Sequence, residues 1–278
     1  MTTAEFLAKF DKALRKLIVR TNPDFATWFY SNARKIFLEV FTKEKLFPPY
    51  QPPQRERVKI WDLEFQSPLF NAAGIFKTGN GYETVASQGA GAFLAGTTTY
   101  LPRGGNVKYS VRHPFLPYPS SHSASNWMGL PNEGHFKVAK KLQSVSKIKG
   151  CPVGASLSLD PEIEESLALQ YLLQGFVYYE IANVDFIELN ESCPNIPHRI
   201  DSKNRLDIGL INRLEFVSDK FLKRRKRNLP VIVKFSNDTD IELIPTLIDL
   251  LIDMGFDGIN FGNTSTCLLY TSPSPRDS

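Results

Sequence analysis

VDFIELNESCPN, from Val184 to Asn195, is an apolar run followed by two amides and a thiol. The run to Leu189 indicates a buried strand, so Cys193 lies just past the strand's C-terminal end. In a βα barrel this is the end at which active sites are built, on loops held by a rigid sheet. Asn, Ser and Pro are also ordinary turn formers, and a lone Cys is often a small buried hydrophobic residue. The hexapeptide from Asn190 alone leaves a functional loop and a plain turn equally open.

Outward from this stretch, short strands alternate with helices from Val58 onward, which is typical of βα units over a parallel sheet. We expect a hairpin at 58–66, strands at 69–73, 92–97, 152–157, 184–189, 231–235 and 258–261, and helices at 81–88, 135–145, 161–182, 207–225 and 241–254. Asp160-Pro161 and Asp240 are expected helix starts, and Gly89 and Gly255 expected helix ends. The predicted fold class is α/β, a TIM (β/α)8 barrel with about six of its eight βα units present.

The first 47 residues predict a separate helical module. Residues 4–19 place apolar side chains on one face and Lys and Arg elsewhere, as in an amphipathic helix. Asn22 suits the N-cap and Pro23 the first position of a second helix. The module could rest on a membrane surface or admit an apolar substrate, or it could simply pack on a core, and the spacing alone favours packing. A proline-rich linker at 48–57 then leads to a barrel domain at 58–266.

Amino-acid composition and net charge exclude several classes of function. A net charge of +4 is too small to argue for nucleic acid. Three cysteines without paired spacing indicate a reducing, cytoplasmic compartment and argue against a disulfide framework or a metal site. No apolar stretch is long enough to span a membrane, and the N-terminus lacks a signal-peptide hydrophobic region. The basic first helix still permits peripheral contact with the cytoplasmic membrane face.

Residues 267–278 depart from the βα pattern. They match an in-frame translation of a transposase-type sequencing-library adapter, so we expect a non-native tail and a longer natural protein. A natural Ser/Pro-rich tail is the alternative.

Polar residues follow each expected strand. This agreement among the strand ends favours a functional site more strongly than the hexapeptide from Asn190 does alone. Asn amides offer both donor and acceptor, so a ring of them suits a small planar ring with alternating C=O and N–H groups. The strand-end segments are Asn71 to Lys77, Gly96-Thr97-Thr98, Ser156, Lys234 and Asn263-Thr264, with an additional loop from Asn126 to Asn132.

In the order of these motifs, most of residues 23–266 resembles the dihydroorotate dehydrogenase family, FMN-dependent enzymes of pyrimidine biosynthesis. The resemblance implies that Cys193 is the catalytic base, which takes a proton from C5 of dihydroorotate while C6 delivers a hydride to FMN. It implies substrate contacts from Lys77, Asn126, Met128, Gly129, Leu130, Asn190, Asn195 and Asn263. It implies FMN contacts from Ala73, Gly74, Lys77, Thr97, Ser156, Asn190 and Lys234. The two lysines are expected to stabilise negative charge on the substrate carboxylate and the reduced flavin.

The chain mixes the two branches of that family. Cys193, Ser156 and residues 128–132 resemble the soluble branch, whose electron acceptors are fumarate or, with a partner subunit, NAD. The N-terminal helices and the spacing from Ala72 to Lys77 resemble the membrane-associated branch, which reduces a quinone. We favour the quinone, because a two-helix module with an aromatic stripe has no evident role in the soluble branch.

The family's last two strands carry glycine-rich loops for the FMN phosphate, and this sequence lacks them. We therefore expect the chain alone to bind FMN poorly and to be inactive. The alternatives are another FMN barrel, similar to dihydropyrimidine dehydrogenase or dihydrouridine synthase, or a catalytically dead barrel used for binding. The oligomeric state stays open.

Overall fold

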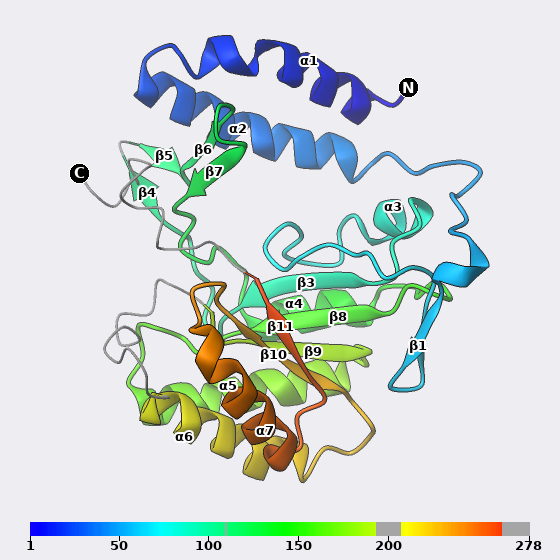
Figure 1. The fold of residues 1–278 in the computed structure, drawn as a ribbon, viewed down its shortest axis with the longest axis vertical. Helices are drawn as coiled ribbons and strands as arrows, with labels where there is room; N and C mark the ends of the chain where they lie inside the picture. Colours follow the sequence, from blue (N-terminus) through cyan, green and yellow to red (C-terminus); the bar gives the residue numbers. More distant parts are fainter. Residues whose placement is uncertain (109, 193–206, 263–278) are drawn as a thin grey trace.

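The computed structural model describes residues 1–108, 110–192 and 207–262, and its centre is a parallel sheet. Within these residues the sheet has five strands in the order β11-β10-β9-β8-β3 (Figure 1). Its strands are β3 (Phe93–Thr98), β8 (Val153–Leu157), β9 (Phe186–Asn190), β10 (Val231–Phe235) and β11 (Gly258–Phe261). Five of the six expected strands are thus confirmed, and the α/β class with them.

Helices connect the strands, as the alternating pattern predicted. They are α3 (Tyr82–Ser87), α4 (His135–Gln143), α5 (Glu165–Ile181), α6 (Ile208–Val217), which continues as a π-helical turn at Ser218–Leu222, and α7 (Ile244–Met254), which follows a 3-10 turn at Ile241–Leu243. Gly255 ends α7 with a φ of 82°, and Gly89 follows α3 with a φ of 86°. Both expected helix ends are confirmed, because these left-handed conformations favour glycine.

The expected first strand, residues 69–73, is not a strand. Here the side chain of Asn71 takes the place of a backbone ladder: its Nδ2 donates to the Leu94 carbonyl at 2.7 Å and its Oδ1 accepts from the Leu94 N–H at 3.2 Å. Farther along, the Gly74 N–H donates to the Gly96 carbonyl at 2.7 Å. The segment therefore runs beside β3 as irregular chain, because a side-chain amide satisfies the strand edge that backbone groups were expected to pair.

One of the two expected helix starts differs. Helix α5 is capped by Glu164, whose carboxylate accepts from the N–H groups of Ser166 and Leu167. Asp160 is buried beside Arg103, with 3.5 Å between Oδ1 and the guanidinium, and its Oδ1 accepts from the Glu162 N–H at 3.3 Å in the turn ahead of α5. Asp240 is a helix start as expected, because it caps the 3-10 turn that leads into α7 and accepts from the Glu242 N–H at 3.0 Å. Both aspartates mark turns, but the helix after Asp160 begins later, at the Glu164 cap.

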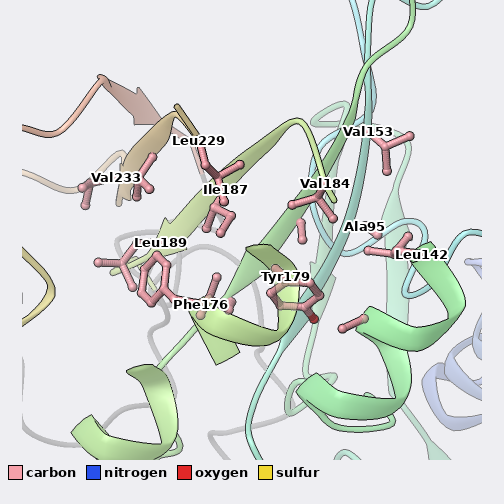
Figure 2. Packing of buried hydrophobic residues seen from close by; sticks show 14 of the residues in the cluster. Ala95, Leu142, Val153, Phe176, Tyr179, Val184, Ile187, Leu189, Leu229 and Val233 are labelled. Carbon is pink, nitrogen blue, oxygen red and sulfur yellow. The ribbon is translucent and has the colours of Figure 1, made fainter. Parts of the chain in front are cut away.

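Successive side chains along each strand point to opposite faces of the sheet, and this creates two apolar layers. Side chains such as Val153, Ile187 and Val233 point outward and pack beneath the helices (Figure 2). The inner face carries a smaller cluster of Phe65, Ala92, Leu94 and Phe186, covered by the hairpin of β1 (Val58–Ile60) and β2 (Leu63–Phe65). This expected hairpin closes the N-terminal end of the sheet, which leaves the C-terminal end for polar side chains.

The N-terminal pair consists of α1 (Thr3–Ile18) and α2 (Pro23–Phe41), which lie along one another (Figure 1). Asn22 caps α2 as expected, accepting from the N–H groups of Asp24 and Phe25. Ser31 joins α2 to a hairpin of β6 (Phe115–Tyr118) and β7 (Ser123–Asn126), because its hydroxyl accepts from the Phe115 N–H at 3.0 Å. Next to it lies the short hairpin of β4 (Val107–Lys108) and β5 (Val111–Arg112), and the sequence predicted neither hairpin.

The apolar faces of this pair are only partly covered. Phe6, Phe10 and Trp28 are 53%, 55% and 52% exposed, whereas Phe41 stacks on the buried Phe76 of the sheet layer. Both interpretations of the module thus have a physical basis, packing at one end and an open aromatic surface at the other. No helix in the described segments is both long and apolar enough to cross a bilayer.

Gly91, just before β3, offers a test of this packing. A Cβ atom added there would lie 1.7 Å from the Ser67 carbonyl oxygen, so Gly91→Ala must displace backbone. We expect a loss of about 1–3 kcal/mol in the free energy of unfolding, measured by urea titration. Gly104→Ala is the matched control, because its added Cβ meets nothing within 4 Å. Equal stability of the two variants would contradict the close approach of this segment to β3.

Candidate active site

Three of the predicted flavin-binding residues meet at the C-terminal end of the sheet. The Thr97 and Ser156 hydroxyl oxygens lie 2.9 Å apart, and Asn190 Nδ2 donates to Thr97 Oγ1 at 2.8 Å. They come from β3, β8 and β9, three neighbouring strands, and all three residues are buried. Strands far apart in the sequence therefore converge on one polar cluster, as strand-end positions in a parallel sheet should.

Two further residues belong to this cluster, and the sequence analysis missed them. Glu188 Oε1 accepts from the Ser156 hydroxyl at 2.8 Å, and Glu188 Oε2 accepts from Asn260 Nδ2 at 2.8 Å. Glu188 has no exposed surface. The available signal was an acidic residue inside an otherwise apolar strand, since a carboxylate almost never lies fully buried without polar partners.

Beyond β9 the chain turns immediately. Asn190 Oδ1 accepts from both the N–H and the hydroxyl of Ser192, at 3.1 Å and 2.7 Å. This is an Asx-type turn, and it fixes the direction in which the chain leaves the sheet. The predicted base Cys193 and the predicted substrate ligands Asn195 and Asn263 lie outside the described residues.

An ion pair holds the same turn from the other side of the sheet. The Glu191 carboxylate accepts from Arg213 of α6 at 3.2 Å and 3.1 Å, and both residues are buried. The Glu191 N–H donates to the Lys234 carbonyl at 2.9 Å. The turn that precedes Cys193 is therefore anchored to a helix and to β10, which is the rigid base that a catalytic loop requires.

Lys234 is the clearest sign of a ligand. It pairs in register with Asn190, so its side chain shares the inner face, and it is only 6% exposed. Within the part of the chain that the structure describes, its ammonium makes no hydrogen bond or ion pair. A buried, unpaired ammonium is costly unless something electron-rich is bound beside it. As far as the described residues go, the positive charge of Lys234 is thus left unmatched.

Two glycines shape the backbone on and beside β3. Gly96 has a φ of 114°, and a Cβ there would lie 2.3 Å from the Ser156 carbonyl oxygen. Gly74 has a φ of 106° and open space around its Cβ position. The preceding residue, Ala73, packs on the inner apolar cluster. Small residues in these conformations let backbone approach a flat ligand. Together with Lys234, Thr97 and Ser156, they fit an isoalloxazine ring.

The remaining predicted substrate residues lie on two other segments. Lys77 is half-buried in the turn that follows Phe76. Asn126 is the last residue of β7, with an exposed side chain, although a loop was predicted there. Residues Met128, Gly129 and Leu130 follow in a turn, where Gly129 has a φ of 69°.

Asn132 ties that turn to the sheet. Its Nδ2 donates to Thr99 Oγ1 at 3.0 Å and to the Leu130 carbonyl at 2.8 Å, and its Oδ1 accepts from the Gly134 N–H at 2.8 Å. The loop from Asn126 to Asn132 is thus fastened just past the end of β3, next to Thr97.

Lys77 belongs to a cationic neighbourhood beneath α2. Burial lowers the pKa of His113, and the nearby charges of Lys35, Arg34 and Lys77 lower it further, against a hydrogen bond to the Gly104 carbonyl that raises it. Three cationic side chains thus lie near His113.

A second buried network lies behind β3. Thr98 Oγ1 is 2.8 Å from His135 Nδ1 and 2.7 Å from the Tyr179 hydroxyl. Burial lowers the pKa of His135 to about 3 and raises the pKa of Tyr179. Both groups stay neutral at physiological pH, so they fix α4 and α5 to the sheet and do not exchange protons. Among the described residues, no group of three or more His, Cys, Asp or Glu side chains could hold a metal ion.

A model of the dihydroorotate dehydrogenase family matches residues 56–272. The chain belongs to the dihydroorotate dehydrogenase family. The match begins just before the β1–β2 hairpin and covers the described sheet, so the polar cluster lies within the matched residues.

Curated relatives and a solved structure agree with the family model. A dihydroorotate dehydrogenase (quinone) of Parvibaculum lavamentivorans is 27% identical over 75% of this chain, and one of Nautilia profundicola is 29% identical over 92%. The chain spans 56% of the length of the first relative and 68% of the second. The crystal structure of an Eimeria tenella DHODH in complex with ferulenol has 19% identity and a TM-score of 0.65, covering 84% of this chain and 66% of that one. This likeness confirms the expected barrel-type fold.

The unmatched charge of Lys234 has a testable consequence. Lys234→Met should stabilise the ligand-free chain by about 1–2 kcal/mol, because it removes a buried ammonium without a partner. The same change should weaken FMN binding about tenfold, because a charge-assisted contact is lost. Urea unfolding and flavin fluorescence titration measure the two effects. Lys149→Met is the control, since its side chain is 87% exposed and neither quantity should change. A less stable Lys234→Met chain would contradict this account.

Proposed function

We propose that the protein containing this chain oxidises dihydroorotate to orotate, with FMN as cofactor, in pyrimidine biosynthesis. One observation carries the proposal: the cluster of Thr97, Ser156 and Asn190 adjoins the buried Lys234, whose ammonium has no partner among the described residues, in a chain of this family. The names of the curated relatives support the same reaction.

Each residue has a proposed task. FMN, when bound, supplies the acceptor for the hydride that leaves C6 of the substrate. Thr97, Ser156, Ala73 and Gly74 line its position, and Lys234 contributes positive charge to its ring. Cys193 removes the proton from C5, which requires a thiol that can approach the thiolate state at working pH.

Substrate recognition is assigned to amides and backbone. Asn190 holds Thr97 and Ser192 in place, so its orientation is already fixed before the substrate arrives. Lys77 lies among cations and is assigned to the substrate carboxylate. The other proposed contacts are Asn126, Met128, Gly129, Leu130, Asn195 and Asn263.

We propose a quinone as the electron acceptor, in preference to fumarate or NAD. Two observations support it: the curated relatives are named as quinone enzymes, and the aromatic side chains of α1 and α2 stay exposed. An uncovered aromatic surface on an amphipathic pair suits peripheral membrane contact, where an apolar acceptor is concentrated.

The base assignment is tested by Cys193→Ala in the complete protein. Dihydroorotate should reduce the flavin about 10²- to 10⁴-fold more slowly, because general-base catalysis is lost, while orotate still binds. Rapid-mixing absorbance of the flavin measures the rate. Cys151→Ala is the control: burial raises the pKa of that thiol to about 12, and it packs in the layer beneath the helices. An unchanged rate in Cys193→Ala would refute its role as the base.

The acceptor assignment is tested on α1. Phe6 and Phe10 stack with ring centroids 6.2 Å apart on the exposed face. Replacing both with Ser should slow quinone-dependent reoxidation of the flavin roughly tenfold, because apolar contact area is lost. Reduction of the flavin by dihydroorotate should not change. Ile208→Ser on α6 is the control, an exposed apolar residue outside the module. Equal reoxidation rates in all three proteins would exclude this surface from quinone reduction.

A further inference from the structure

A continuous series of side-chain hydrogen bonds runs through the candidate site. Its bonds are 2.7–2.9 Å long, and four strands of the sheet contribute to it (Figure 1). In order, its members are Asn260 of β11, Glu188 of β9, Ser156 of β8, Thr97 of β3, Asn190 of β9 and Ser192 just beyond β9.

The Glu188 carboxylate fixes the direction of the two hydrogen bonds that it accepts. An amide nitrogen only donates, and an ionised carboxylate only accepts. Glu188 therefore accepts from Asn260 on one oxygen and from the Ser156 hydroxyl on the other. A serine hydroxyl has one hydrogen, so Ser156 has none left to give.

The remaining bonds follow from that hydrogen count. Ser156 can only accept from Thr97, so the Thr97 hydroxyl is the donor in their 2.9 Å contact. Thr97 in turn accepts from the Asn190 amide nitrogen. This leaves the Asn190 oxygen to accept the N–H and the hydroxyl of Ser192. Every hydrogen bond in the series thus points toward Glu188.

We propose that Glu188 is a positioning residue for this site: its buried carboxylate sets the direction of the whole series, and thereby which atom Asn190 turns toward Thr97 and which toward the chain before Cys193. The proposal rests on the proposed function, because it assumes that Thr97, Ser156 and Asn190 hold the cofactor and substrate. The hydrogen bonds themselves do not depend on that assumption.

The burial of Glu188 indicates that its carboxylate orients the neighbouring side chains and does not stabilise the fold. Glu188 is fully buried, and within the described residues it forms no ion pair. Its register partner on β10 is the apolar Ile232, and Phe186 lies two residues earlier on the same face. An apolar side chain at 188 would avoid the cost of desolvating a charge. It would also leave the Ser156 and Thr97 hydroxyls free to point either way.

The test is Glu188→Gln in the complete protein. Glutamine keeps the shape but has one acceptor oxygen in place of two. If its NH₂ faces Asn260, either two donors meet or the Asn260 amide must rotate out of its present orientation. If it faces Ser156, the series reverses and the Asn190 amide presents NH₂ to the Ser192 N–H. Either conflict should raise the dissociation constant of FMN at least about tenfold, measured by quenching of free FMN fluorescence.

A second substitution should restore the direction. In Glu188→Gln combined with Asn260→Asp, the new carboxylate accepts from the Gln NH₂, and the Gln oxygen again accepts from Ser156. The double variant should bind FMN at least about threefold more tightly than Glu188→Gln alone. Asn260→Asp alone should bind poorly, since it places two carboxylates together. Wild-type affinity in Glu188→Gln, or no recovery in the double variant, would overturn the proposal.

Asp257→Asn separates positioning from stability. It is the matching carboxylate-to-amide substitution at a paired side chain, which accepts from the Arg225 guanidinium at 2.9 Å and from the Val231 N–H at 2.8 Å, at the end of the sheet opposite the site. It should lower the urea midpoint of unfolding and leave the FMN dissociation constant within about twofold of wild type. Weakening of FMN binding equal to that of Glu188→Gln would reduce Glu188 to a stability role and overturn the proposal.

Failure of the proposed function is distinguishable from failure of this inference. If the wild-type protein binds no FMN, the proposed function fails, and the direction of the series is then judged by unfolding alone. The urea midpoint of the double variant should lie above that of Glu188→Gln. A midpoint lowered by the sum of the two single effects would show that Glu188 and Asn260 do not act together, which would overturn the inference.

Discussion

The arrangement of the candidate site depends on one buried carboxylate within the apolar strand β9. Glu188 gathers Ser156 and Asn260, and through Ser156 it extends to Thr97 and Asn190. A charge in this position is tolerable only when its oxygens are satisfied, so the neighbouring strands must supply donors at matching heights. Parallel register provides those heights: Ser156 pairs with Glu188, and Lys234 pairs with Asn190.

The two faces of the sheet have different roles. The outward face is apolar and holds the helices, with Ile187, Leu189 and Val233 in one continuous layer. The inward face changes from apolar to polar along each strand, from Phe186 to Glu188 and then Asn190 on β9. The hairpin β1–β2 covers the apolar end. Within the described residues, a polar surface therefore lies at the end where strands lead into loops, and there the Lys234 ammonium has no partner from the described part of the chain. Stability and ligand binding are thus built on opposite faces and opposite ends of the same strands.

The sequence predicted most of the fold because its signals are local. Runs such as 184–189 and 231–235 are apolar and bounded by turn residues, and Asn22-Pro23 is a helix start that depends only on neighbouring residues. The failures are tertiary. Residues 69–73 look like a strand, but the Asn71 side chain pairs with Leu94 twenty-three positions away. Asp160 looks like a helix cap, but its carboxylate pairs with Arg103 and bonds to the turn at Glu162, and the helix begins only at Glu165. For the site, strand-end positions identified Thr97, Ser156, Asn190 and Lys234. Asn260 is penultimate in β11, as Ser156 is in β8, and the strand-end pattern could have found it. Glu188 lies inside β9, where the role of a polar residue depends on its cross-strand neighbours.

The central claim is that the site oxidises dihydroorotate, and the most direct measurement is anaerobic addition of dihydroorotate to the complete, FMN-loaded protein. The account predicts that the visible absorbance of the flavin is lost with dihydroorotate, and not with dihydrouracil or with RNA that contains dihydrouridine. Bleaching by either of those, with none from dihydroorotate, would assign the barrel to another flavin reaction. A well-folded complete protein that binds no flavin would contradict the account at its root.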